Sequence, residues 1–342
     1  MKPHNLVLSI LLFQAALSNA AVVLQYHHVD TETPDSTSTS PTLFKDHIEF
    51  IVNNDFKVTP LTEITHKLTN NEKVEDKTVA ITFDDGYISV YENAFPILKK
   101  YGIPFTVFVN TDPIEANRPT HISWSQLREM KNNGGTIANH THNHSYLIEP
   151  RSNAKVRENH IINEINTAQS IINKKLKQDI KLFAYPYGEF DKTTKKILSE
   201  LGYISFGQHS GAIPSEPDFQ ALPRFPASNQ YGQFPQFAQK LNSTAFENTT
   251  FKPNSGIVYQ DRNNPPELFI YGDSSAIKNI NCFGSSVGRL EKVRESASTY
   301  MVKAPTPFNM RRFRYNCTSR STETGRFSWI SIPWINLSVS NQ

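Results

Sequence analysis

The chain has 342 residues, of which 38% are hydrophobic and 11% aromatic, so it is long enough for one large domain and a smaller one. This composition excludes a disordered chain. The formal net charge is only +3 and no block of Lys and Arg occurs, which argues against a nucleic-acid-binding protein.

The first residues have the pattern of a secretory signal peptide. Lys2 supplies the positive start, Asn5–Leu17 is a short apolar core, and Ser18-Asn19-Ala20 is a cleavage site of small residues. We expect residues 1–20 to be removed and the mature chain to begin at Ala21. No later stretch approaches the roughly 20 apolar residues of a membrane span. The sequence therefore predicts export, to a periplasm or outside the cell, and no transmembrane segment.

Residues 21–244 show an alternation of short apolar strands and amphipathic helices. This alternation predicts parallel βα units, and polar clusters follow the strands, where a barrel builds its active site. We therefore predict an α/β fold, a distorted (β/α) barrel. The strands are expected at Val22–Val29, Val79–Phe83, Phe105–Val109, Leu182–Tyr185, Ser205–Gly207 and Leu222–Phe225, and the helices at Leu43–Asn53, Val90–Tyr101, Trp124–Asn133, Val156–Leu176 and Lys192–Leu201.

Residues 245–342 have a different texture, without helical periodicity and with short aromatic runs such as Leu268–Tyr271 and Phe327–Ile330. This pattern predicts a small antiparallel β domain, similar to a sandwich, whose role the sequence does not indicate. Its aromatic residues serve either as its core, which we favour, or as a sugar platform. The chain's two cysteines, Cys282 and Cys317, both lie here. In an exported protein they predict one disulfide, worth roughly 3–4 kcal/mol in the chain-entropy interpretation, and the alternative is two buried thiols.

Two stretches of the barrel carry candidate metal ligands. Val79–Phe83 is predicted to be a buried strand that ends at Asp84-Asp85-Gly86, and adjacent carboxylates at such a place are costly unless a cation compensates them. An ordinary Asp-Gly turn is the alternative. His140 and His144 are four residues apart, a spacing that lets both rings reach one ion, and His142 is their competitor. Asp85 with His140 and His144 would leave coordination positions open for water and substrate.

The motifs Thr82-Phe83-Asp84-Asp85-Gly86, His140-Thr141-x-x-His144 and Tyr185-Pro186-Tyr187-Gly188, in this order, resemble the polysaccharide deacetylases of carbohydrate esterase family 4. The resemblance covers the barrel, about two thirds of the chain. It implies that Asp84 is the general base, that Asp85, His140 and His144 hold a divalent metal, and that the backbone N–H of Tyr187 faces the developing oxyanion. Zinc is the default ion for these ligands, with cobalt, nickel and manganese as alternatives.

The chain departs from the family pattern at two positions. The usual Leu-x-x-His context of the catalytic acid does not occur, but Tyr26-His27 resembles a permuted branch, the exported deacetylases of β-1,6-linked N-acetylglucosamine polymers. We therefore expect His27 to be the acid, with His209 and then His28 as rivals. Ala184 stands where many members have an arginine that orients the base, and Arg224 is the candidate to replace it. The alternative for Arg224 is a surface position.

The resemblance implies an exported, metal-dependent hydrolase that removes N-acetyl groups from a polysaccharide or oligosaccharide containing N-acetylglucosamine. Its substrate would be poly-β-1,6-N-acetylglucosamine, chitin fragments or peptidoglycan. The metal would activate a water molecule, Asp84 would take its proton, and His27 would protonate the departing amine. Alternatives are an esterase of O-acetylated xylan and a carbohydrate-binding protein without catalysis. Asn-x-Ser/Thr triplets at Asn139 and Asn143, inside the histidine cluster, are interpreted as chance, which favours a bacterial source. The oligomeric state stays open.

Overall fold

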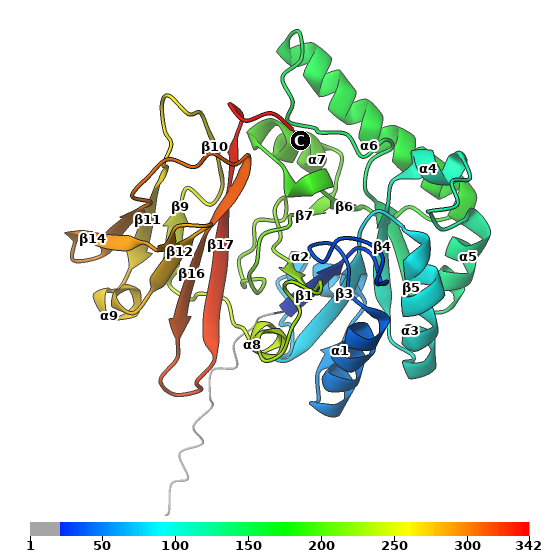
Figure 1. Ribbon diagram of the computed structural model, residues 1–342, viewed down its shortest axis with the longest axis horizontal. Helices are drawn as coiled ribbons and strands as arrows, with labels where there is room; N and C mark the ends of the chain where they lie inside the picture. Colours follow the sequence, from blue (N-terminus) through cyan, green and yellow to red (C-terminus); the bar gives the residue numbers. More distant parts are fainter. Residues whose placement is uncertain (1–20, 342) are drawn as a thin grey trace, which may run out of the picture.

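The structure, a computed structural model, describes residues 21–341 and contains a parallel sheet with helices around it and two antiparallel sheets at its side (Figure 1). The predicted signal peptide, residues 1–20, lies outside the described residues and stays a prediction. Within residues 21–341, every helix is too short or too polar to traverse a lipid bilayer.

The parallel sheet has eight strands and confirms the predicted distorted (β/α) barrel. Its order is β7-β6-β5-β4-β3-β1-β8, with β2 paired to β3, and each of these pairings is parallel. The central strands are buried on both faces, which is why they read as continuous apolar runs. The strands are β1 (Ala21–Tyr26), β2 (Lys57–Val58), β3 (Thr78–Phe83), β4 (Phe105–Val109), β5 (Gly135–Asn139), β6 (Leu182–Ala184), β7 (Ile204–Phe206) and β8 (Phe225–Pro226).

An irregular segment, rather than a regular strand pair, joins the two edges of this sheet. Leu222 bridges Phe206 of β7, and Phe225 pairs with Leu24 of β1. The prediction of one continuous strand over Leu222–Phe225 was therefore wrong. The chain changes its hydrogen-bonded neighbour from β7 to β1 within this stretch, which distorts the barrel here.

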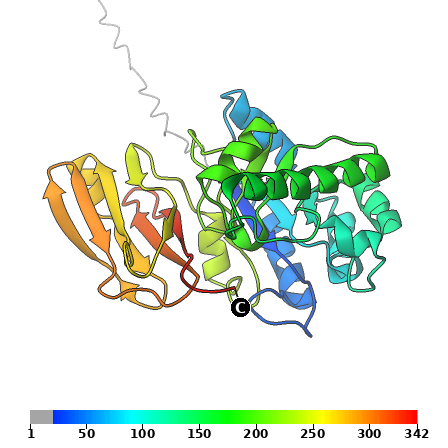
Figure 2. The same ribbon diagram turned by 90° about the horizontal axis from the view of Figure 1, so that it is seen from above.

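Helices surround the sheet, and the long helix α6 lies across one side of the barrel (Figure 2). The apolar face of α6, with Ile161, Ile165 and Ile172, is buried. The helices of the barrel are α1 (Pro41–Asn53), α2 (Leu61–Thr69), α3 (Phe95–Tyr101), α4 (Thr111–Glu115), α5 (Trp124–Asn132), α6 (Ala154–Leu176), α7 (Lys192–Glu200) and α8 (Gln236–Leu241). Of these, α2, α4 and α8 were not predicted, because each is short and follows closely on a neighbouring element.

The predicted helix Val90–Tyr101 is not a uniform α-helix. It starts with a π-helical turn over Val90–Ala94, and α3 follows at Phe95. Pro96 explains the change, because its ring lacks an N–H donor and clashes with the carbonyl four residues earlier.

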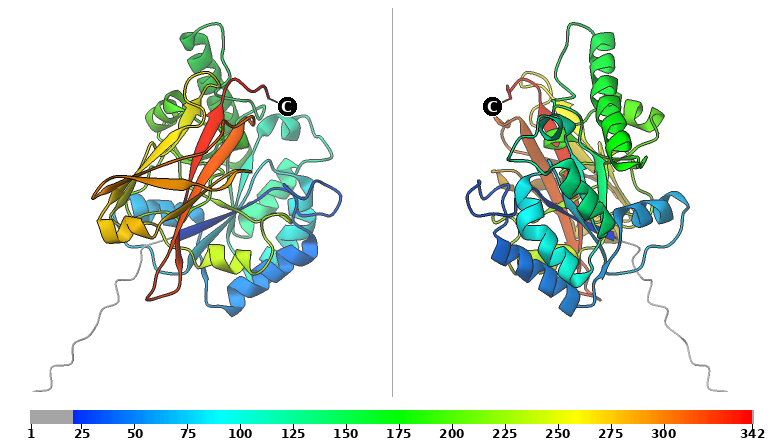
Figure 3. Two further views of the ribbon diagram at one scale, coloured as in Figure 1. Left: turned by 60° about the vertical axis from the view of Figure 1, so that its left-hand side comes forward. Right: turned by 90° about the vertical axis from the view of Figure 1, so that its right-hand side faces the viewer.

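The C-terminal region contains two sheets of mostly antiparallel strands, as predicted (Figure 3). The pair between β10 and β17 is parallel. One sheet has the order β10-β17-β16-β12-β13 and the other β14-β15-β11-β9. A short helix, α9 (Ser274–Lys278), lies between β11 and β12. The strands are β9 (Thr249–Lys252), β10 (Gly256–Val258), β11 (Glu267–Gly272), β12 (Asn281–Gly284), β13 (Gly288–Arg289), β14 (Glu291–Ser296), β15 (Thr299–Lys303), β16 (Arg312–Arg320) and β17 (Phe327–Asn336).

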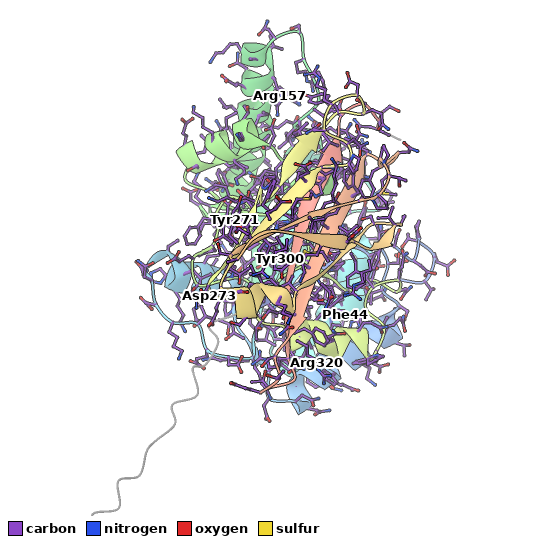
Figure 4. All side chains as sticks on the ribbon, turned by 90° about the vertical axis from the view of Figure 1, so that its left-hand side faces the viewer. Phe44, Arg157, Tyr271, Asp273, Tyr300 and Arg320 are labelled. Carbon is purple, nitrogen blue, oxygen red and sulfur yellow. A yellow bond between two sulfur atoms is a disulfide. The ribbon has the colours of Figure 1, made fainter. Side chains whose placement is uncertain are left out.

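Most of the C-terminal aromatic residues that we considered form packing contacts. Tyr315 and Trp334 are buried in the core between the sheets, as we favoured. Trp329 packs edge-on against Phe225 of the barrel. Tyr271 is exposed on the four-stranded sheet (Figure 4). A flat aromatic platform of these residues is therefore not formed.

The disulfide predicted between Cys282 and Cys317 is confirmed. The two residues face each other across β12 and β16, and both are buried. The bond therefore joins neighbouring strands of the five-stranded sheet.

Strand β17 attaches the C-terminal sheets to the barrel through backbone hydrogen bonds. Trp329 N donates to Thr244 O at 3.0 Å, and Ser331 N donates to Ser210 O at 2.7 Å. Both bonds come from β17, so this strand connects the C-terminal sheets directly to the backbone of the barrel. The domain boundary after Thr244 remains our proposal.

Candidate functional site

The candidate site lies where several strands of the parallel sheet end. β1 ends just before His27, β3 just before Asp84 and Asp85, β5 just before His140, and β6 just before Tyr185. Because the carboxyl ends of parallel strands meet at one face of a barrel, side chains from distant parts of the sequence gather here.

The turn after β3 separates two neighbouring carboxylates. Asp84 is buried and its N–H donates to Tyr26 O at 2.9 Å, which continues the pairing with β1. Asp85 then has a left-handed φ of 71°, which aspartate tolerates better than most residues. Gly86 also has a positive φ, and a Cβ there would lie only 3.0 Å from Val109 Cγ1. The tight turn directs the Asp84 and Asp85 side chains to different partners.

Asp85, His140 and His144 lie together. Nε2 of His140 and Nε2 of His144 are each 3.2 Å from Asp85 Oδ1. One donor atom from each of the three residues lies within 4.8 Å of the other two. The structure therefore brings His140 and His144 together with Asp85, and not His142.

The loop after β5 holds the two histidines in place. His140 Nδ1 lies 2.7 Å from Ala184 O, so Nδ1 carries the proton and Nε2 presents its lone pair to the cluster. Thr141 has a left-handed φ, and its N–H donates to Asn139 Oδ1 at 2.9 Å. His142 turns away from the cluster, and its Nδ1 is 2.8 Å from Thr111 Oγ1.

This cluster fits a divalent cation. Asp85 Oδ1 and His140 Nε2 are buried and have no hydrogen-bond partner, although buried polar atoms in folded proteins are almost always bonded. Two imidazole nitrogens and one carboxylate oxygen are donors that zinc and its neighbours in the transition series accept. The donor set and its unmet bonds therefore make Asp85, His140 and His144 a candidate metal site.

Asp84 forms a buried ion pair with Arg224. The guanidinium donates from Nη1 to Oδ1 at 2.7 Å and from Nη2 to Oδ2 at 2.8 Å, and both side chains are fully buried. Arg224 is itself fixed, because its Nε donates to Gly207 O at 2.9 Å. Of the two alternatives considered for Arg224, the structure therefore places it beside Asp84 and not at the surface.

The surroundings of Asp84 hold its carboxylate ionised. Burial alone would raise the pKa of Asp84, but the charge of Arg224 and its hydrogen bonds outweigh it, and the pKa lies below its ordinary value. Asp84 is thus charged and oriented, while it lies next to the cluster that Asp85 forms.

Three histidines were considered as the acid, and His27 lies nearest to Asp84. Its Nε2 is 3.9 Å from Asp84 Oδ2, and its side chain is partly exposed. His28 points elsewhere, since its Nδ1 is 3.5 Å from Asp30 Oδ2 and its ring stacks on Tyr87. The alternation of side chains along an extended segment explains why neighbouring histidines face different partners.

His209 is buried behind the site. It lines a cavity of about 610 Å³ between the barrel and the C-terminal sheets, and its backbone O accepts from Arg224 N at 2.9 Å. Burial, followed by the charge of Arg314, lowers the pKa of His209 to about 3. At neutral pH its ring is therefore uncharged and has no proton to spare for an amine.

Tyr187 lies in the turn after β6, next to His144. It has a left-handed φ of 59° within the 3₁₀ turn Pro186–Gly188. Its ring contacts the His144 ring edge-on at 4.4 Å between centroids and stacks on Tyr146 at 3.8 Å. A bulky residue rarely adopts this φ, so the contacts around it must hold it there.

Two residues at the site were not predicted. Gln25 donates from Nε2 to Asp84 Oδ2 at 2.7 Å. A sequence signal for it existed, because a buried polar residue in an apolar strand lies on the same face as His27 two positions later. Tyr146 gave no such signal, since it lies in a loop without periodicity.

Comparison with known proteins finds relatives of the barrel. Residues 71–205 match the family described as polysaccharide deacetylase. A poly-β-1,6-N-acetyl-D-glucosamine N-deacetylase of Staphylococcus aureus strain MRSA252 is 29% identical over 229 residues, which cover 60% of this chain and 78% of that protein.

Two solved structures share the fold. The Streptococcus pyogenes deacetylase PplD, in complex with acetate, has a TM-score of 0.58 at 26% identity and matches 66% of this chain and 99% of its own. IcaB from Ammonifex degensii has a TM-score of 0.58 at 26% identity and matches 66% of this chain and 98% of its own. Residues 71–205 therefore form a polysaccharide deacetylase domain, which indicates an enzyme of this class.

Proposed function

We propose that this enzyme uses a divalent cation to hydrolyse N-acetyl groups on a polysaccharide or oligosaccharide that contains N-acetylglucosamine. The observation that carries the proposal is the buried donor set of Asp85, His140 and His144, which lacks hydrogen-bond partners and adjoins an ionised Asp84. The products are acetate and a free amine on the sugar. No separate observation on the described residues favours the alternative, an esterase of O-acetylated xylan.

In this proposal Asp85, His140 and His144 hold the cation, and zinc is the expected ion, ahead of cobalt, nickel and manganese. When bound, such an ion polarises the acetamide carbonyl and lowers the pKa of water. The hydrogen bond between His140 and Ala184 O supports this role, because it leaves Nε2 free to bind.

Asp84 acts as the general base and accepts the proton of the attacking water. Its two oxygens are oriented by Arg224 and by Gln25, so little motion is needed when the proton arrives. Arg224 is in this sense a positioning residue, because it acts through Asp84. A base of this kind contributes about 10²–10⁴-fold to the rate.

His27 donates a proton to the nitrogen as the C–N bond breaks, and the backbone N–H of Tyr187 stabilises the oxyanion formed before that step. The first N–H groups of a helical turn have no acceptor within the turn, which leaves the amide of Tyr187 free for this task. His27 is supported by its place beside Asp84 and by its partial exposure to the site.

The substrate class rests on the relatives. The Staphylococcus aureus relative is named as a deacetylase of poly-β-1,6-N-acetyl-D-glucosamine, and PplD was solved with acetate, which is the expected product here. We propose poly-β-1,6-N-acetylglucosamine as the first polymer to test, followed by chitin fragments and peptidoglycan. Such polymers lie outside the cytoplasm, which agrees with the proposed signal peptide over residues 1–20.

Acetate release tests the proposal directly. We expect zinc-loaded protein to release acetate from N-acetylated glucosamine polymers, to fall to background after chelation, and to recover when zinc is returned. O-acetylated xylan serves as the comparison substrate. Acetate from xylan alone would replace the proposal with an esterase, and tight binding of metal-loaded protein without acetate release would replace it with a carbohydrate-binding protein.

The His27→Ala variant tests the acid. We expect kcat to fall about 100-fold, within the range for a general acid, whereas His209→Ala keeps most of kcat. The physical reason is that His27 lies beside Asp84 and His209 is uncharged at neutral pH. Steady-state kinetics on a soluble oligomer measure both. The opposite pattern, with the large loss in His209→Ala, would reverse the assignment.

A further inference from the structure

The turn that contains Tyr187 is held by a charge from the C-terminal sheets. Glu189 follows this turn, is 1% exposed, and receives bonds from Arg311 Nε at 2.7 Å and Arg311 Nη2 at 2.8 Å. Arg312 Nη1 adds a third bond at 3.1 Å. Among the described residues, each salt-bridge partner of Glu189 therefore comes from the C-terminal region and none from the barrel itself.

Arg311 also reaches the loop that follows His144. Its Nη2 donates to Glu149 Oε1 at 2.7 Å, so one guanidinium binds carboxylates from two loops of the site. The stacked rings of Tyr146 and Tyr187 join the same two loops. The guanidinium of Arg311 lies 5.6 Å from the centre of the Tyr146 ring, which adds a contact of cation–π type.

Arg311 is itself held firmly by the C-terminal sheets. Its backbone O accepts from Asn336 N at 2.7 Å, and its Nη1 donates to Val339 O at 3.1 Å. It directly precedes β16, which pairs with β17 along its whole length. Figure 1 shows the chain after β17 reaching over to the barrel. The C-terminal region therefore fixes the guanidinium, whose N–H groups donate to the carboxylates of Glu189 and Glu149.

We infer that Arg311 is a positioning residue for deacetylation, which holds the turn after β6 so that the backbone N–H of Tyr187 faces the reacting carbonyl. The inference rests on the proposed function. Arg311 lies outside residues 71–205, the part of the chain that matches the family. The C-terminal region thereby gains a task, because it completes the active site of the barrel.

The conformation of Tyr187 explains why such a clamp is needed. Its left-handed φ of 59° is unfavourable for a bulky residue, so the turn relaxes unless neighbouring contacts hold it. An oxyanion donor works only at about 2.7–3.1 Å from the developing charge. A shift of about 1 Å in such a group can lower the rate about 10²-fold. Glu189 connects Arg311 to this turn, because it follows Gly188 directly and both of its carboxylate oxygens accept hydrogen bonds from Arg311.

The chain offers a matched control for this clamp. Arg326 also connects the C-terminal region to the barrel, since its Nη1 binds Asp76 Oδ2 at 2.8 Å, but it contacts no residue of the site. Arg311→Met removes the ion pairs with Glu189 and Glu149, and Arg326→Met removes the ion pair with Asp76, so both variants lose charge contacts between the two parts of the chain. We expect kcat of zinc-loaded Arg311→Met to fall about tenfold or more with a smaller change in KM, and kcat of Arg326→Met to stay within about twofold.

A conservative variant separates positioning from folding. Arg311→Lys keeps the charge but loses the two-pronged bond to Glu189, so we expect kcat between the wild type and Arg311→Met. If Arg311→Met does not fold, as judged by circular dichroism, the comparison uses Arg311→Lys and Glu189→Gln against Arg326→Met. We expect the zinc affinity of each folded variant to stay within about twofold, because the ligand residues are unchanged.

The outcomes are distinct. A wild type that releases no acetate from any N-acetylated glycan contradicts the proposed function and leaves nothing for Arg311 to position. A wild type that is active, with equal kcat in Arg311→Met and Arg326→Met, overturns the inference. A zinc affinity that falls in parallel with kcat also overturns it, because Arg311 would then act through His144 and not through the amide of Tyr187.

Discussion

We expect Asp84→Asn to lower kcat for acetate release about 10³-fold and to leave zinc binding intact. Asparagine has nearly the same shape but cannot accept the proton of water, and a general base contributes about 10²–10⁴-fold. The proposed metal ligands Asp85, His140 and His144 are unchanged, so a competition titration with a chromophoric chelator should give the wild-type zinc affinity. Acetate release from an N-acetylglucosamine oligomer measures kcat.

The same variant also weakens the fold, which must be separated from the loss of chemistry. Arg224 and Gln25 donate hydrogen bonds to both oxygens of Asp84. In Asp84→Asn one of these oxygens becomes an NH₂ group, which is itself a donor and faces at least one of these donors. Asp76→Asn is the control for the same chemical change away from the site, because it removes the charge that pairs with Arg326 at the contact between the two parts of the chain. Kinetics are compared at a temperature where all variants are folded. More than a tenth of wild-type kcat in folded, zinc-loaded Asp84→Asn would exclude Asp84 as the base.

The part of the site that lies at strand ends could be predicted from the sequence. Asp84 and Asp85 end an apolar strand, and His140 and His144 have the spacing of ligands on one ion. A parallel sheet brings such positions together without further information, because its carboxyl ends share one face. The pairing of Arg224 with Asp84 was proposed from the family resemblance, because Ala184 stands where many members have a base-orienting arginine and Arg224 adjoins the last predicted strand.

The contacts between the barrel and the C-terminal sheets could not be predicted. Arg311 and Glu189 are 122 residues apart, and nothing in the local pattern of either residue indicates the other. Their contact depends on how β17 is bonded to the barrel, which is a property of the whole fold. Tyr146 is similar, because a loop side chain has no period that fixes its direction. Local sequence patterns thus predict the candidate reacting groups, whereas the contacts that position them depend on the packing of the whole fold.

The ion pair between Arg224 and Asp84 is the second place where one substitution has a large effect. We expect Arg224→Met to lower the free energy of unfolding by about 3–5 kcal/mol, because it leaves the charge of Asp84 buried and unpaired. Methionine fills much of the volume, so a cavity contributes little. Urea unfolding of metal-free protein measures the loss, and Arg326→Met, whose ion pair is partly exposed, should lose about 1 kcal/mol or less.

The pH dependence of Arg224→Met then reports on Asp84. In the wild type the pKa of Asp84 is lowered, so the ion pair adds stability above the ordinary carboxyl range, near pH 3.9, and this stability is lost as the pH falls through the lowered pKa. Without Arg224 the effect of burial dominates, and the pKa rises. We therefore expect the stability difference between wild type and variant to shrink at low pH. We also expect the acidic limb of the kcat/KM profile of zinc-loaded Arg224→Met to move to higher pH. An unmoved acidic limb, with kcat/KM as in the wild type, would mean that Arg224 does not set the ionisation of the base.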